Sequence, residues 1–136
     1  MGLKLSLAIL GVAALAGASA AAHHAFSAEF DVKQPVTLTG AISKIEMVNP
    51  HAWIHIDVKG ADGKVTTWKI ETGAPNSLAR RGVTKNMLPI GQTVVVTGYR
   101  AKDMSFTAAG DRVKFPDGRN LSVGGSAEQG FPTRRK

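Results

Sequence analysis

The feature that most constrains the fold of this chain is an apolar repeat of two residues. Apolar and polar residues alternate over 36–42 and again over 52–58, and the run 93–99 is dense in β-branched residues. A repeat of two is typical of strands with one buried face, whereas an amphipathic helix repeats about every 3.6 residues. The sequence therefore predicts a mainly β fold.

The first predicted strand changes phase along its length. After Ile42 the alternation slips at Lys44, so that Ile45 and Met47 continue the apolar face. Such a slip indicates a β-bulge, at which the strand gains one extra residue and bends. Gly40 permits a sharp bend because it carries no side chain. We therefore expect a long, bent first strand.

The next two strands are predicted to form a hairpin. The second strand follows Pro50, and Asp62-Gly63 then turns the chain into a third strand over 65–72,. Alternation along the second strand separates two faces. One face carries Ala52, Ile54, Ile56 and Val58, and the other carries Trp53, His55 and Asp57.

A helical segment interrupts the strands after residue 74. Pro75 suits a first helical turn, and the basic pair Arg80-Arg81 before Gly82 suits a helix C-terminus, so we predict a short helix over 75–81,. A further turn is expected over 84–88. Two more strand regions follow, first 93–99 and then a last strand or hairpin formed by Val113, Phe115, the Asp117-Gly118 turn and 121–123,.

Three strands, a short helix and two more strands form the order of an OB-like five-stranded barrel, in an all-β chain with one short helix. A small open β-sandwich or meander is the main alternative, because it permits the same alternation. The residues expected to point inward are Leu38, Ile42, Ile54, Ile56, Val58, Trp68, Ile70, Leu78, Val94, Val96 and Val113.

The first residues have the pattern of a secretory signal peptide. Lys4 provides a positive start, 5–15 is almost wholly apolar, and small residues fill 16–22,. The apolar stretch is shorter than the roughly 20 residues of a transmembrane helix. We therefore expect export to the periplasm or the exterior, and cleavage after Ala20, Ala21 or Ala22.

Four regions follow from these patterns. Residues 1–22 form the signal peptide, 23–35 an N-terminal arm, 36–123 a single OB-like domain, and 124–136 a flexible basic tail,. After processing, no transmembrane segment is expected.

Composition restricts the chemistry. The chain has no cysteine, which excludes a thiol nucleophile and a thiolate metal site,. Its net charge of +7 favours anionic partners, such as membrane headgroups, acidic glycans or acidic periplasmic proteins,. Nucleic acid is not expected as a partner of an exported protein. No nucleophile elbow or paired acidic motif occurs, so the sequence does not predict an enzyme.

All four histidines lie in two short segments, at His23, His24, His51 and His55. Cleavage after Ala22 would free the amine of His23, so that its amine and ring chelate one metal and another imidazole completes a copper-type histidine brace. A cut after Ala20 or Ala21 would instead give a square-planar nitrogen site, which favours Cu(II) or Ni(II). The sequence thus predicts that the processed N-terminus binds copper.

His51 and His55 are not expected to bind the same ion. On one straight strand they would lie roughly 13 Å apart, at about 3.3 Å per residue, which is too far for one metal. We expect His51 to be the third ligand, with His55 as the second choice. In the alternative without a metal, His23 and His24 belong to a frayed end, His51 caps a loop and His55 faces solvent.

A second hypothesis is a binding module for an anionic or glycan ligand or a protein partner. It rests on an aromatic and basic platform of Trp53, Lys69, Arg100, Lys102 and Phe106,. In the alternative without a binding site, Phe26 or Phe30 covers the indole of Trp53 and the cations are merely solvated.

Several separated motifs resemble those of a family of small exported bacterial proteins of unknown function. They are His23-His24-Ala25-Phe26 with Glu29-Phe30-Asp31, Asn49-Pro50-His51-Ala52-Trp53, Pro75-Asn76-Ser77-Leu78 with Arg80-Arg81-Gly82, and Gly98-Tyr99-Arg100-Ala101-Lys102-Asp103. The resemblance covers nearly all of the mature chain. It implies export and a leader that ends directly before the His-His pair, but no established activity.

Overall fold

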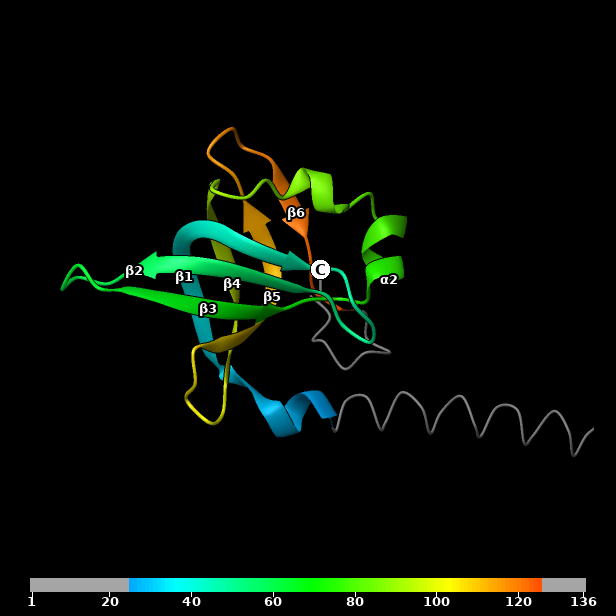
Figure 1. The fold of residues 1–136 in the computed structure, drawn as a ribbon. Coiled ribbons are helices and arrows are strands. Elements are labelled where there is room, and N and C mark those ends of the chain that lie inside the picture. Colours follow the sequence, from blue (N-terminus) through cyan, green and yellow to red (C-terminus); the bar gives the residue numbers. More distant parts are fainter. Residues whose placement is uncertain (1–24, 126–136) are drawn as a thin grey trace, which may run out of the picture.

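The computed structural model describes residues 25–125, which fold into six strands and short helical segments (Figure 1). Residues 25–29 are helical, α2 covers Pro75–Arg80, and the 3-10 helix η1 covers Lys85–Met87. The strands are β1 (Phe30–Glu46), β2 (Trp53–Lys59), β3 (Val65–Glu71), β4 (Thr93–Ala101), β5 (Thr107–Lys114) and β6 (Asn120–Ser122).

Five of these strands form a closed ring. The sheet order is β3-β2-β1-β4-β5-β6, with antiparallel neighbours, and an additional parallel pairing joins β3 to β5. Because α2 lies between β3 and β4 in the chain, this is the OB-like order that the sequence predicts,. The open meander is excluded, since the β3–β5 pairing leaves no gap in the ring.

The predicted bulge in β1 is confirmed. Ile42 pairs with Ile56 but Lys44 pairs with His55, so β1 has one extra residue between these two pairs. At Gly40 a Cβ atom would lie 2.5 Å from the carbonyl oxygen of Asp57, so the strands approach too closely for any side chain there. The bend lets β1 pair with β4 along its first part and with β2 along its last part.

The predicted core is confirmed as well. Of the residues expected to point inward, Leu38 and Val58 are partly buried against the core, and the others are buried. Helix α2 covers one end of this core with Leu78, which is buried, and ends at Arg80 before Gly82, whose φ is +76°. The predicted short helix and its glycine stop therefore form as expected.

Strand β5 begins earlier than the sequence indicates. The expected strand region starts at Val113, yet β5 starts at Thr107 and runs through Ala108-Ala109-Gly110. Small residues are needed there because neighbouring backbones come close. A Cβ atom on Gly98 of β4 would lie 2.0 Å from the carbonyl oxygen of Ala109. Alternation and β-propensity do not reveal a strand of this composition.

A second, smaller apolar cluster fastens the N-terminal helical residues to the ring. Phe26 and Phe30 are buried with Ala101 and Ala109, and the rings of Phe26 and Tyr99 meet edge to face at 6.4 Å,. Figure 1 shows residues 25–29 at the end of the ring, beside the β4–β5 loop. The amide of Lys102 donates to the carbonyl of Glu29 at 2.8 Å, and its ammonium donates to the carbonyl of Ser27.

The expected signal peptide, the pair His23-His24 and residues 126–136 of the basic tail lie outside the described residues. Within residues 25–125, no helix has both the length and the apolar character to cross a membrane.

Candidate functional site

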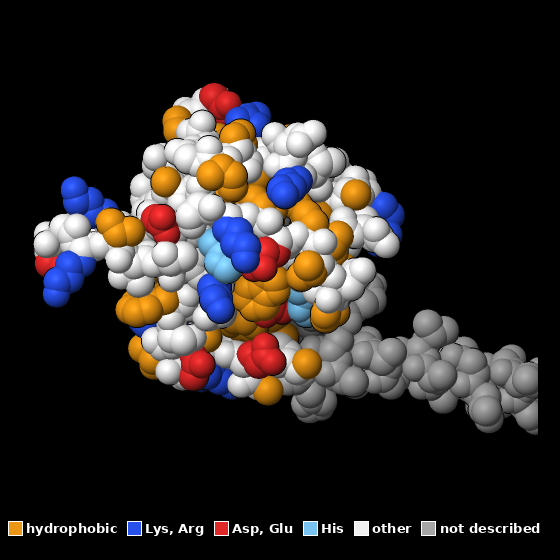
Figure 2. All heavy atoms as spheres, viewed as in Figure 1, with side chains coloured by type: hydrophobic (Ala, Val, Ile, Leu, Met, Phe, Trp, Pro, Cys, Tyr) orange, Lys and Arg blue, Asp and Glu red, His pale blue; other side chains and the backbone are white. Residues whose placement is uncertain are grey.

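The candidate site lies on the outer face of β1, β2 and β3. Strand register places Glu46, Trp53 and Glu71 in one row across the three strands. Two residues along each strand, Lys44, His55 and Lys69 form the next row on the same face,. Figure 2 shows histidine, basic and acidic side chains gathered around a hydrophobic patch on this side of the molecule.

His51 reaches this face from the β1–β2 loop. The neighbouring Ala52 is fastened in place, since its amide donates to the carbonyl of Gly73 at 3.1 Å and its own carbonyl accepts from the amide of Thr72 at 2.9 Å. Nδ1 of His51 pairs with Oε1 of Glu71. The Asn49–Pro50 peptide bond that precedes His51 is cis.

The Glu71 carboxyl is unusually buried, with a side chain only 8% exposed. Burial raises the pKa of Glu71 above its ordinary value, because a carboxylate loses its hydration there,. The interaction with His51 opposes this rise, and the negative charge of Glu29 adds to it. Glu71 and His51 therefore form a partly desolvated acid–imidazole pair.

His55 pairs with a different carboxylate. Its Nε2 lies 2.6 Å from Oε2 of Glu46, while Oε1 of Glu46 lies 2.9 Å from Nζ of Lys44. Hydrogen bonds from Lys44 and then from His55 lower the pKa of Glu46. The His55 side chain is only 12% exposed, so it does not face solvent as the metal-free alternative supposed.

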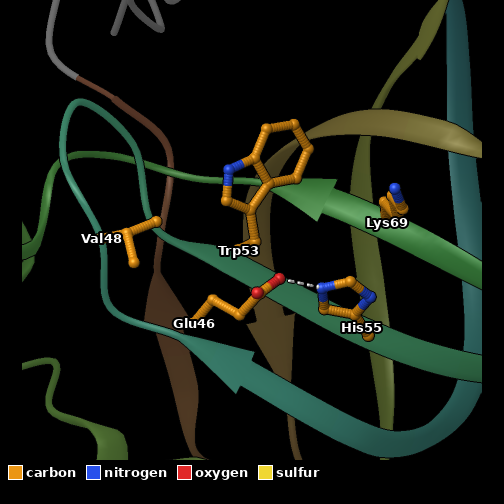
Figure 3. Close-up of a pocket in the computed structure, with 5 residues that line it drawn as sticks. All are labelled: Glu46, Val48, Trp53, His55 and Lys69. Atoms are coloured by element: carbon orange, nitrogen blue, oxygen red, sulfur yellow. Dashed lines mark hydrogen bonds and ion pairs between the residues drawn. The ribbon is translucent and has the colours of Figure 1, made fainter.

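Three hollows meet at Trp53. The first, of about 250 Å³, lies over the His55–Glu46 pair (Figure 3). The second, of about 300 Å³, extends from Trp53 to the β4–β5 loop, where Lys102 and Asp103 line it. The third, of about 310 Å³, extends to the N-terminal helical residues and contains His51. Phe30 lines the second and third hollows together with Trp53, and Trp53 stays partly exposed.

The structure separates the two described histidines. His51 lines the third hollow with Glu71, and His55 lines the first with Glu46. His23 and His24, the other two predicted ligands, lie outside the described residues. Within 25–125, no three histidine, aspartate or glutamate side chains are grouped so that they could hold a metal ion.

The predicted binding platform is divided into parts. Trp53 and Lys69 share the first hollow, and Lys102 shares the second with Trp53. Arg100 and Phe106 instead pack around Trp68: the guanidinium lies 5.3 Å from its ring centroid, and the ring of Phe106 meets it edge to face at 5.5 Å,. The β3–β5 pairing, which the alternation did not predict, brings these two residues beside Trp68 of β3.

Sequence reasoning missed the carboxylates. Glu46 and Glu71 are the partners of the two imidazoles, and both end their strands directly beside Trp53. A glutamate is seldom buried unless it is paired, so an acid at the end of an apolar strand was the available signal. Only the strand register shows which histidine each one meets.

Comparison with known proteins places the chain in a family but adds no activity. A family model matches residues 11–110. No curated protein and no solved structure matches the chain. The chain belongs to DUF6152, a family of unknown function.

Proposed function

We propose that this is an exported protein that binds copper at its processed N-terminus, as a carrier, sensor or accessory protein and not as an enzyme. The ligands are the α-amine and imidazole nitrogens of the His23-His24 segment, and His51 completes the set. Nitrogen ligands of this kind favour Cu(II). The export itself is proposed from the leader pattern of residues 1–22,.

One observation carries the assignment of His51. Ala25 and Phe26 line the same hollow as His51 and Glu71. His24 is bonded directly to Ala25, and consecutive Cα atoms lie about 3.8 Å apart. The covalent chain therefore brings the His-His segment to within one or two residues of the hollow that contains His51.

The carboxylate beside His51 supports the same assignment. A histidine that ligates a metal usually donates its other ring N–H to a carboxylate, which orients the ring and raises its basicity. Glu71 is such a carboxylate for Nδ1 of His51. We therefore assign Nε2 of His51 to the metal and Glu71 to the orientation of the ring.

His55 is the weaker candidate. It lies in the first hollow, whereas Ala25 and Phe26 line the third. Its Nε2 is engaged with Glu46 at 2.6 Å. We therefore leave His55 out of the copper site.

The test combines mass spectrometry of the mature N-terminus with a Cu(II) titration of that mature chain. We expect His51→Gln to weaken Cu(II) binding by at least about tenfold, because it removes a ligand and even the loss of a ligand's outer-shell partner costs about 10–100-fold in affinity. His55→Gln is the matched control and should bind as the unchanged chain does. Acetylation of the α-amine should abolish tight binding, because that amine is a ligand for each of the three cuts.

Two results would contradict the proposal. One is a mature chain that begins after His24, since it would lack both adjacent imidazoles. The other is Cu(II) binding that neither α-amine acetylation nor His51→Gln weakens. Electron paramagnetic resonance of the Cu(II) form would count the nitrogen ligands directly.

A further inference from the structure

The first hollow has the shape and lining of a binding site for a small ring. It measures about 250 Å³ and is lined by Glu46, Val48, Trp53, His55 and Lys69 (Figure 3). Drug-sized ligands occupy pockets of about 300–1,000 Å³, lined by apolar and aromatic groups with a few polar ones. A hollow just below that range suits one ring and not a longer ligand.

The apolar part of the lining is an aromatic wall. In Figure 3 the indole of Trp53 stands between Val48 and Lys69. Trp53 is partly exposed, and Val48 of the β1–β2 loop, which is 50% exposed, lines the hollow beside it. A flat aromatic face with a polar edge accepts ligands that combine an apolar face with hydrogen-bonding groups, as a sugar ring does.

The charges in the hollow are unequally compensated. Both carboxylate oxygens of Glu46 are engaged, one by Lys44 at 2.9 Å and one by His55 at 2.6 Å. Among residues 25–125, the ammonium of Lys69 makes no hydrogen bond or ion pair, and the residue is exposed. The hollow therefore presents an unneutralised positive charge beside the indole, in a chain of net charge +7.

We propose that this hollow binds one sugar ring that carries a carboxylate, such as a uronate residue of an acidic glycan. The apolar face of the ring stacks on Trp53, and the carboxylate pairs with the ammonium of Lys69. The engaged Glu46–His55 pair supplies fixed polar atoms for the ring hydroxyls. In Figure 3 the second ring nitrogen of His55 points away from Glu46, and no drawn interaction reaches it.

A membrane headgroup fits these observations less well. Insertion into a lipid surface needs exposed apolar side chains on one face. The large exposed apolar residues are instead spread over two strands and three loops, and only Met104 and Phe106 share a loop; the full set is Val32, Val48, Val65, Ile90, Met104 and Phe106. A recessed indole beside a single ammonium suits a soluble ring and not a flat surface.

The test follows the indole N–H signals of Trp53 and Trp68 by NMR, with EDTA present so that no metal contributes. Methyl galacturonate is the probe, and methyl galactoside is the matched ligand without the carboxylate. We expect methyl galacturonate to shift the Trp53 signal saturably and to leave Trp68 in place. The neutral ring should bind about tenfold more weakly, because a charge-assisted hydrogen bond is lost.

Lys69→Gln should reduce the affinity for methyl galacturonate by about tenfold. Lys59→Gln is its matched control, because Lys59 is also an exposed lysine of the β2–β3 hairpin but does not line the hollow. An unchanged Trp68 signal in both variants would show that the fold is intact.

Three results would overturn the proposal: no shift of Trp53, equal affinity for the charged and neutral rings, or equal binding by the two variants. A shift caused only by vesicles of anionic phospholipid would replace the sugar by a lipid. His51→Gln, which removes the proposed copper ligand, should leave sugar binding unchanged. The failure of either proposal is therefore visible independently of the other.

Discussion

At the scale of single residues, Trp53 lies between two histidine–carboxylate pairs. His55 pairs with Glu46 on one side, and His51 pairs with Glu71 on the other. The two acids have opposite environments: hydrogen bonds lower the pKa of Glu46, whereas burial raises the pKa of Glu71. The carboxyl of Glu46 therefore stays ionised to lower pH than usual, whereas desolvation opposes the ionisation of Glu71,.

The lowered pKa of Glu46 predicts a pH dependence of stability. A carboxyl whose pKa is lower in the folded chain than its ordinary 4.5 stabilises the fold above pH 4.5, and this contribution is lost as the pH falls through the lowered value,. We expect Glu46→Gln to unfold at lower urea concentration near neutral pH. The two chains should then converge as the pH falls below 4.5.

Urea unfolding at a series of pH values measures this effect. The difference between the chains should shrink in high salt as well, because the Lys44 ammonium is largely exposed to solvent,. A difference that is the same at every pH would show that Glu46 acts through packing and not through its charge.

At the scale of elements, the N-terminal helical residues are positioned by a few contacts outside the main core. Phe26 and Phe30 pack with Ala101 and Tyr99, and the backbone of Lys102 holds the carbonyl of Glu29. These contacts fix the position of residues 25 and 26, which line the hollow together with His51. The docking of this helix and the proposed copper site are therefore linked.

Phe26→Ala should undock the helical residues and leave the ring folded. Loss of a buried aromatic ring costs about 3 kcal/mol, and here that cost falls on one small cluster. We expect the amide of Lys102, which donates to Glu29, to exchange with solvent much faster. The amide of Lys69, which donates to the carbonyl of Phe106 inside the ring, is the internal control and should stay protected.

Hydrogen exchange followed by NMR separates the two amides. If both amides lost protection together, the helix and the ring would unfold as one unit, and the idea of a separate docking contact would be wrong.

At the scale of the whole molecule, stability rests on the closure of the ring around one core. The parallel β3–β5 pairing joins Ile70 to Ala108, and both residues are buried. The chain has no cysteine, so no disulfide supports this closure,. Packing of apolar side chains across strands far apart in the sequence is what holds the ring.

Ile70→Ala should therefore destabilise the whole domain by about 2–5 kcal/mol, the range for removing a buried isoleucine side chain to alanine. Ile90→Ala is the matched control, because Ile90 is 60% exposed, and it should change stability by less than about 0.5 kcal/mol,. Urea and thermal unfolding measure both variants. Equal effects of the two substitutions would mean that closure of the ring contributes little.

The sequence by itself determined the β class, the bulge in β1, the short helix and those core residues that lie in the alternating strands and the helix. These features are local: the apolar alternation, the phase slip at Lys44 and the Pro75 and Gly82 signals act within a few residues,. The alternation can be recognised without knowing the partner strand, because it arises from the burial of one face of the strand. The core residues of the alternating strands were therefore predictable without the topology, whereas others, such as Leu88 and Ala108, were not.

Only the tertiary structure decided how the candidate site is assembled. Strand register and ring closure determine where β5 begins and which glutamate each histidine contacts. They also determine that Arg100 and Phe106 pack against Trp68 and not beside Trp53. Those contacts join residues that are distant in the chain, and the local sequence permits several strand registers. Side-chain chemistry alone can identify the residues that take part, but the close packing of the strands determines which of them are in contact.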